Sequence, residues 1–174
     1  RSVERITFPL ASPQANWIEN RITGAVTAEG TFTATVETRA KGALQYSLRE
    51  AFMQTYTDRE RGEIANTIAG RVMQGGRGEN LVAFDGRDLA ADPYVKVDVR
   101  ADRALQRSGG GWVFRLPIPN MADPTLVARL EEERGRRRLP IDVSEASGPQ
   151  SVVSVLELTL PTDWVAELPP DVTV

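Results

Sequence analysis

The residues with the clearest capacity for ligand chemistry form the run from Arg134 to Arg138, with the sequence RGRRR. Guanidinium groups match phosphate oxygens in paired hydrogen bonds, so this run could bind a polyanion. Three glutamates, Glu131–Glu133, directly precede it and offset most of its positive field. Positive charge also suits the C-terminal end of a helix. The pattern therefore favours a solvated helix end, with polyanion binding through Arg134–Arg138 as an alternative.

Two loops could hold ions. The glycine-rich loop from Gln74 to Gly78 follows an expected helix and precedes an expected strand, which is the reverse of the order in phosphate-binding loops. The acidic loop from Asp85 to Asp88, with Asp92 beyond it, lacks the alternating ligands and the terminal glutamate of a calcium-binding EF-hand. Both loops are interpreted as connectors, and no metal or cofactor is assigned to them.

The chain contains no His and no Cys, which removes most catalytic devices. Cys-His and Ser-His-Asp machinery, thiolate chemistry and zinc bound by His or Cys are all excluded. Paired carboxylates remain possible, because two acids suffice for glycoside hydrolysis. The acidic residues fall mainly on turns, helix surfaces and polar strand faces. The sequence therefore predicts no catalytic, cofactor-binding or metal-binding residue, and a carboxylate-dependent hydrolase acting on glycans stays an alternative.

Length and composition indicate one globular domain. The chain has 174 residues, of which 41% are hydrophobic and 26% are charged. Its net charge of -3 gives no overall attraction to nucleic acid. No charge-free apolar run approaches the roughly 20 residues that a membrane span needs.

Alternating patterns predict the strands. Apolar and polar residues alternate over 22–28 and again over 32–36, on either side of Glu29-Gly30, which predicts a β-hairpin. Valines alternate with charged residues over 95–100, so one face of that strand should lie on a core and the other in water. Such one-sided strands favour an antiparallel sheet. Further strands are predicted at residues 81–84, 112–118 and 152–160.

Helical spacing appears between the strands predicted at 32–36 and 81–84. An apolar stripe from Leu44 to Thr55 predicts one helix. Thr57 and Glu60 have the spacing of a capping box and open a second helix that ends at Gly75-Gly76. Asp123-Pro124 predicts the start of a short third helix reaching Leu130. The expected fold is α+β: an antiparallel β-sheet, or a sandwich-like pair of sheets, with an αα-hairpin packed on one face and one further short helix.

The three tryptophans could stack on sugars or on peptide side chains. Trp112 lies on the apolar side of its expected strand, so a core position is predicted for it. Trp164 stands between Pro161 and Pro169 and is the least committed of the three, which also include Trp17. Core or interface packing is the favoured interpretation for all three.

Several short motifs occur in an order shared with a known group of proteins. In chain order they are Gly24-Ala25-Val26, Thr35-Val36-Glu37, Gly42-Ala43-Leu44, Leu48-Arg49-Glu50, Leu116-Pro117-Ile118-Pro119, Arg138-Leu139-Pro140-Ile141, Leu158-Thr159-Leu160-Pro161 and Leu168-Pro169. With them, the chain from Trp17 to Val174 resembles the C-terminal region of bacterial envelope proteins that join an N-terminal domain of unknown function to a central transglutaminase-like domain.

The resemblance implies a role beside an enzyme. In such proteins the Cys-His-Asp chemistry belongs to the central domain, so no catalytic residue carries over to this chain. It implies a non-catalytic accessory or binding module at a periplasmic or cell-envelope location. Its partners would be adjacent domains of the parent chain, and a protein, peptide or glycan of the envelope. We expect a leading segment (1–17) and a compact domain (18–174), excised from a larger protein, with a possible unpaired edge near Val172–Val174.

Overall fold

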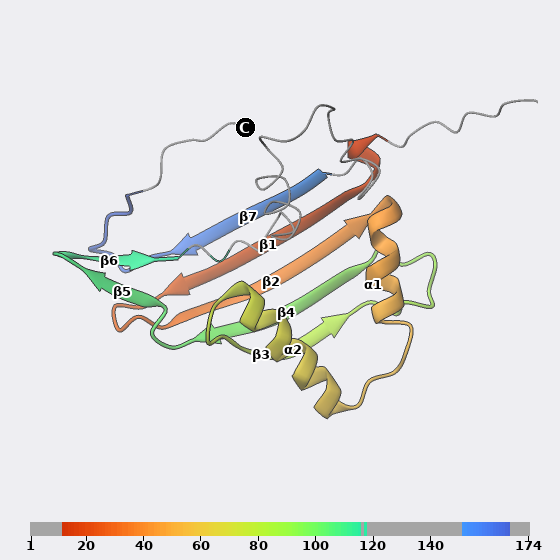
Figure 1. Cartoon of the computed structure of the whole chain (residues 1–174), viewed down its shortest axis with the longest axis horizontal. Coiled ribbons are helices and arrows are strands. Elements are labelled where there is room, and N and C mark those ends of the chain that lie inside the picture. Colours follow the sequence, from red (N-terminus) through yellow and green to blue (C-terminus); the bar gives the residue numbers. More distant parts are fainter. Residues whose placement is uncertain (1–11, 116, 118–150, 168–174) are drawn as a thin grey trace, which may run out of the picture.

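A computed structural model describes residues 12–115, 117 and 151–167, and these form an α+β fold (Figure 1). The main sheet has five strands in the order β3-β4-β2-β1-β7, and β5 and β6 form a separate two-stranded sheet. The strands are β1 (Trp17–Val26), β2 (Phe32–Lys41), β3 (Arg77–Ala83), β4 (Tyr94–Ala101), β5 (Leu105–Ser108), β6 (Gly111–Phe114) and β7 (Ser151–Thr159). The helices are η1 (Pro13–Ala15), η2 (Gly42–Leu44), α1 (Gln45–Ala51) and α2 (Asp58–Val72).

The predicted hairpin is confirmed as β1 and β2. The two strands pair antiparallel from Trp17 opposite Lys41 to Val26 opposite Phe32. Gly30 in the connecting turn has a φ of 87°, a left-handed conformation that glycine adopts without steric cost. The strand predicted at 95–99 is β4, which pairs antiparallel with both β2 and β3.

The last strand departs from the expectation of an antiparallel sheet, because β7 pairs parallel to β1. Its alternation was visible in the sequence, and Leu156 and Leu158 lie opposite Ile22 and Gly24 on the same face. Alternation fixes which side chains share a face of a sheet, but it carries no information about the direction of the neighbouring strand. The sheet is therefore mostly antiparallel, with one parallel edge pair.

Both helices lie on one face of the main sheet, as predicted (Figure 1). Helix α2 begins with a complete capping box, in which the Thr57 side chain accepts from the Glu60 backbone and the Glu60 carboxylate accepts from the Thr57 backbone. Its buried Ala65, Ala69 and Val72 pack over β3 and β4. Helix α1 is shorter than its apolar stripe predicted and ends at Ala51, where the Phe52 backbone N–H bonds to Arg49 and Glu50 carbonyls.

The β5–β6 hairpin differs from the prediction in two respects. Strand β5 was not predicted, because Leu105–Ser108 is short and mostly polar. The prediction of a core position for Trp112 is wrong: the residue is 49% exposed, although it sits on the alternating strand as expected. The side chain that reaches the core from β6 is Phe114, whose ring centroid lies 5.5 Å from that of Phe32.

Some predictions lie outside the described residues. These are the helix from Asp123 to Leu130, the arginine run Arg134–Arg138 and the edge near Val172–Val174. Among the residues that the structure does describe, no helix combines the length and the apolar character that crossing a bilayer requires.

Candidate functional site

The main sheet has two unlike faces. Side chains of successive residues in a strand point to opposite faces, so each strand contributes one set to each side. One face packs against α1 and α2 and carries the core residues of β1, β2 and β4. The opposite face, here called the open face, carries Thr, Glu, Asp, Arg and Lys side chains. Its principal residues are Glu19, Arg21, Thr23, Thr35, Glu37, Arg39, Lys96, Asp98, Arg100 and Glu157.

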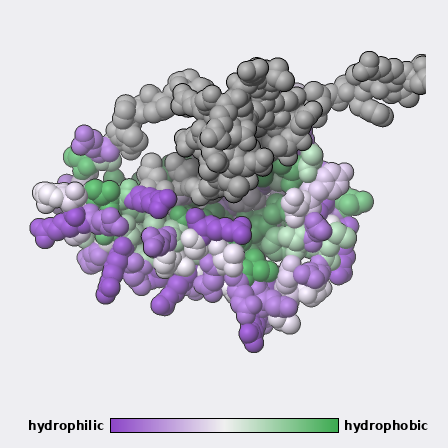
Figure 2. Space-filling model, in the orientation of Figure 1, coloured by the Kyte–Doolittle hydropathy of each residue, from purple (hydrophilic) through white to green (hydrophobic). Residues whose placement is uncertain are grey.

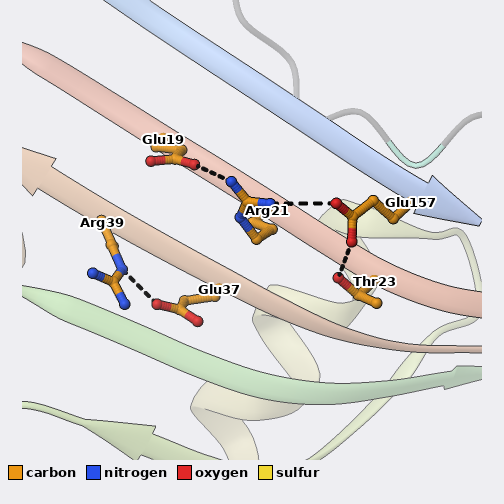
Figure 3. Close-up of polar contacts among 6 residues, drawn as sticks. All are labelled: Glu19, Arg21, Thr23, Glu37, Arg39 and Glu157. Atoms are coloured by element: carbon orange, nitrogen blue, oxygen red, sulfur yellow. Dashed lines mark hydrogen bonds and ion pairs between the residues drawn. The ribbon is translucent and has the colours of Figure 1, made fainter.

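Ion pairs organise the open face across β7, β1 and β2 (Figure 3). Arg21 lies between two carboxylates, with Nη2 at 3.0 Å from Glu19 Oε1 and Nη1 at 3.4 Å from Glu157 Oε1. On the neighbouring strand, Arg39 Nε lies 2.5 Å from Glu37 Oε1, which raises the pKa of the Arg39 guanidinium. Side chains of opposite charge thus alternate both along and across the strands.

Asp98 on β4 is the most constrained acid of the open face. Its two carboxylate oxygens accept from Thr35 Oγ1 at 2.8 Å and from Asn80 Nδ2 at 2.9 Å. Asn80 sits where the β3–β4 register shifts and has a φ of 53°, so this irregularity aims its amide at Asp98. The hydrogen bond from Asn80, followed by that from Thr35, lowers the pKa of Asp98.

Two adjoining hollows mark the open face. The larger, of about 680 Å³, is lined by Thr35, Glu37, Arg39, Asn80, Val82, Tyr94, Lys96 and Asp98. The smaller, of about 300 Å³, is lined by Glu19, Arg21, Glu37 and Arg39, so the two share their Glu37–Arg39 wall. The charged groups balance in each hollow, with two acidic and two basic side chains. The open face therefore offers many fixed donors and acceptors with no net charge.

The lowered pKa of Asp98 predicts an acid-dependent loss of stability. A depressed folded-state pKa contributes stability above the unfolded-state value of about 3.9, and this contribution is lost as the pH falls through the folded-state pKa. Replacing Asp98 with Asn removes that contribution. We expect the free energy of unfolding of D98N to fall below that of the wild type at pH 7, and the difference to narrow by pH 3, as measured by urea unfolding.

Asn80→Gly tests the cause of this shift, because glycine keeps the left-handed backbone and removes the larger of the two hydrogen-bond effects. The pKa of Asp98 should rise in N80G, as followed by the NMR titration of the Asp98 carboxyl carbon. An unchanged titration in N80G, or a D98N difference that is constant from pH 3 to pH 7, would contradict the assignment.

A second recess, here called the apolar groove, lies on the other side of the sheet. It has a volume of about 610 Å³ and runs between α1, α2 and the strands beneath them. Figure 2, seen from the helix side, shows hydrophobic side chains gathered between the two helices with hydrophilic ones around them. Its apolar lining consists of Val36, Leu48, Ala51, Phe52, Ile64, Ile68, Val72, Val95 and Val97. Asn20 and Thr38 are the polar strand residues in this lining.

The acidic loop and the glycine-rich loop are both engaged in local hydrogen bonds. The side chains of Asp85 and Asp88 accept hydrogen bonds from the backbone amides of Arg87 and Ala90, as in ordinary turns. In the glycine-rich loop, the Gly76 amide donates to the Met73 carbonyl oxygen. Within the described ranges no cluster of three or more metal-ligating side chains occurs.

Two of the three tryptophans, Trp112 of β6 and Trp164, stack on each other. The rings of Trp112 and Trp164 stack with centroids 6.4 Å apart and planes 10° from parallel. The Arg107 guanidinium lies 5.8 Å from the Trp112 ring centroid. Trp17, the first residue of β1, is half-buried. One face of the Trp112 ring is thus taken up by Trp164, which reduces the surface available for a ligand.

A catalytic acid of a glycoside hydrolase needs a raised pKa. In the described part of the chain, hydrogen bonds lower the pKa of the Glu29, Glu60 and Asp98 carboxyl groups. The carboxylate-dependent hydrolase acting on glycans stays an untested alternative.

The sequence patterns did not lead us to predict that Asn20 faces inward, and they identified the open face only as polar. The signal for Asn20 was available, because it is in phase with Ile22, Gly24 and Val26 and is therefore a polar residue at an inward position. Asn80 gave no such signal, since its role depends on the β3–β4 register.

Comparisons of the chain with protein-family models, with curated proteins and with solved structures returned no match.

Proposed function

We propose that this chain is a non-catalytic accessory module of a transglutaminase-like protein of the bacterial envelope, and that it binds a neutral glycan through the open face. The observation that carries the proposal is the balanced polar surface around the Glu37–Arg39 pair. Two hollows meet there. Hydrogen bonds or ion pairs hold all four lining side chains of the smaller hollow and five of the eight in the larger one.

The chemistry of the open face fits a polyhydroxyl ligand. Each sugar hydroxyl is both a donor and an acceptor, and the face presents carboxylates, guanidinium groups and hydroxyls that satisfy both functions. A strongly charged ligand would gain little from a surface with equal numbers of acidic and basic groups. Protein interfaces have cores depleted in Lys, Glu and Asp, whereas these residue types make up half of the principal residues of the open face. Tyr94 adds an aromatic ring at the rim of the larger hollow.

Titration with soluble oligosaccharides tests the proposal. Soluble chitotetraose, cellotetraose and maltotetraose would be titrated into the chain and followed by backbone amide chemical shifts. We expect saturable binding of at least one of them with Kd on the order of 0.1–1 mM, equivalent to roughly 4–5.5 kcal/mol. The shifts should map to β2 and β4.

Arg39→Ala should weaken this binding about 10-fold, because its partner Glu37 also loses its orientation. Arg59→Ala is the matched control, since Arg59 also pairs with a glutamate but has an exposed side chain on α2, away from the open face. Binding that is equal in R39A and R59A, or shifts confined to the helices, would refute the open face as the glycan site.

A further inference from the structure

The apolar groove contains a buried amide whose polar atoms are only partly satisfied. Asn20 is 8% exposed and lines the groove from β1. Its Oδ1 accepts from Thr38 Oγ1 at 2.9 Å. Within the part of the chain that the structure describes, its Nδ2 group donates to no acceptor. Because an unsatisfied buried donor costs about 1–3 kcal/mol, its presence in a largely apolar lining points to a group that it binds.

The dimensions of the apolar groove favour a slender ligand. Residues from Glu60 to Val72 of α2 line it, and twelve steps of about 1.5 Å give a length of roughly 18 Å. Dividing about 610 Å³ by this length leaves a mean cross-section of roughly 34 Å². An α-helix about 10 Å in diameter has a cross-section of roughly 80 Å², so the groove cannot enclose an amphipathic helix.

The polarity of the groove argues against an extended peptide as well. A peptide carries a backbone donor and acceptor at nearly every residue, and each needs a partner when buried. The strand backbones beneath the groove are already paired within the sheet. The charged lining residues Glu60, Glu63 and Arg71 are exposed on α2. Among the described lining residues, the Asn20 amide is the buried donor without an acceptor, and an aliphatic chain with a single neutral acceptor group matches it. A charged acceptor buried beside it would need a counter-charge.

We propose that the apolar groove binds the acyl chain of a monoacyl lipid, with the chain carbonyl accepting a hydrogen bond from Asn20 Nδ2. An extended aliphatic chain advances about 1.25 Å per carbon for C–C bonds of about 1.5 Å, so a groove of roughly 18 Å accommodates about 14 carbons. The site lies on the opposite side of the sheet from the open face, and it stands independently of glycan binding.

The probe is 1-monomyristoylglycerol, titrated below its critical micelle concentration into the full 174-residue chain. We expect saturable chemical-shift changes in α1, α2 and the Asn20 side-chain amide. The matched probe 1-O-tetradecylglycerol keeps the chain and headgroup but lacks the carbonyl, and should bind about 3- to 10-fold more weakly. Asn20→Leu should weaken binding of the ester by a similar factor and abolish the difference between ester and ether.

Two helix variants keep the test decisive if N20L fails to fold. Ala51 is exposed and lines the groove, so Ala51→Trp should fill it and abolish saturable binding. The adjacent Glu50 is exposed and does not line it, so Glu50→Trp should bind as the wild type does. The proposal is overturned if the wild type shows no saturable binding, if A51W and E50W behave alike, or if trileucine binds in the groove and the lipid does not.

Discussion

Replacing Phe32 with Ala is expected to lower the free energy of unfolding by about 3–5 kcal/mol, the range for deleting a fully buried aromatic ring. Phe32 is 0% exposed and stands at the start of β2, opposite Val26 of β1 and Ala101 of β4. Its removal loses the transfer free energy of the ring and leaves a cavity that two flanking strands prevent from collapsing. Because domains of this size are stable by only about 5–15 kcal/mol, this is a large fraction of the total.

Urea unfolding followed by circular dichroism measures the effect of F32A as a lower midpoint with an unchanged slope. Phe32→Leu retains most of the apolar volume and should lose much less. F32A should also speed amide exchange in β5 and β6, because Phe114 packs on Phe32 and the Ala104 amide donates to the Gly30 carbonyl oxygen at 2.8 Å. A loss below about 1 kcal/mol, the ordinary effect of a point substitution, would contradict this packing.

Local signals account for the part of the fold that the sequence predicted. The β1–β2 hairpin joins two alternating runs through a glycine turn, and α2 begins at a capping box, so each depends on neighbouring residues. The partner of β7 could not be predicted from local sequence. Its pairing places Trp17 opposite Ser151, residues far apart in the chain, and depends on which edge of the sheet the chain returns to. Trp112 shows the same limit. Its alternation was correct, but the residue of β6 that packs against the core is the partly buried Phe114.

The candidate sites were harder to predict than the fold for a related reason. The polar alternation of β4 identified Lys96 and Asp98 as solvent-facing, yet the hydrogen bonds to Asp98 come from β2 and from the irregular point of β3. A constellation assembled from three strands exists only once their register is set. Asn20 is the exception, since its inward phase could be read from β1 alone.

Replacing glycine with alanine should change the free energy of unfolding in opposite directions at two positions, Gly78 beside α2 and Gly70 within it. Gly78 of β3 lies against the helix backbone, and a Cβ there would stand less than 3.0 Å from the carbonyl oxygen and carbon of Ala65. Neither atom belongs to a flexible side chain, so α2 would have to move away from the sheet. The Gly78 amide also donates to Asn66 Oδ1 at 3.0 Å, and that contact would be strained. We expect Gly78→Ala to lower the free energy of unfolding by about 3 kcal/mol.

Gly70→Ala provides the matched control for Gly78→Ala, because Gly70 lies inside α2 and an added Cβ would meet no atom within 4 Å. Alanine is favoured over glycine within a helix by about 0.5–1 kcal/mol, so G70A should raise the free energy of unfolding. Urea midpoints of the two variants should therefore move in opposite directions from the wild type. Equal midpoints for G78A and the wild type would mean that α2 can leave β3 without cost. In that case the contact with β3 would not fix the position of α2 along the apolar groove.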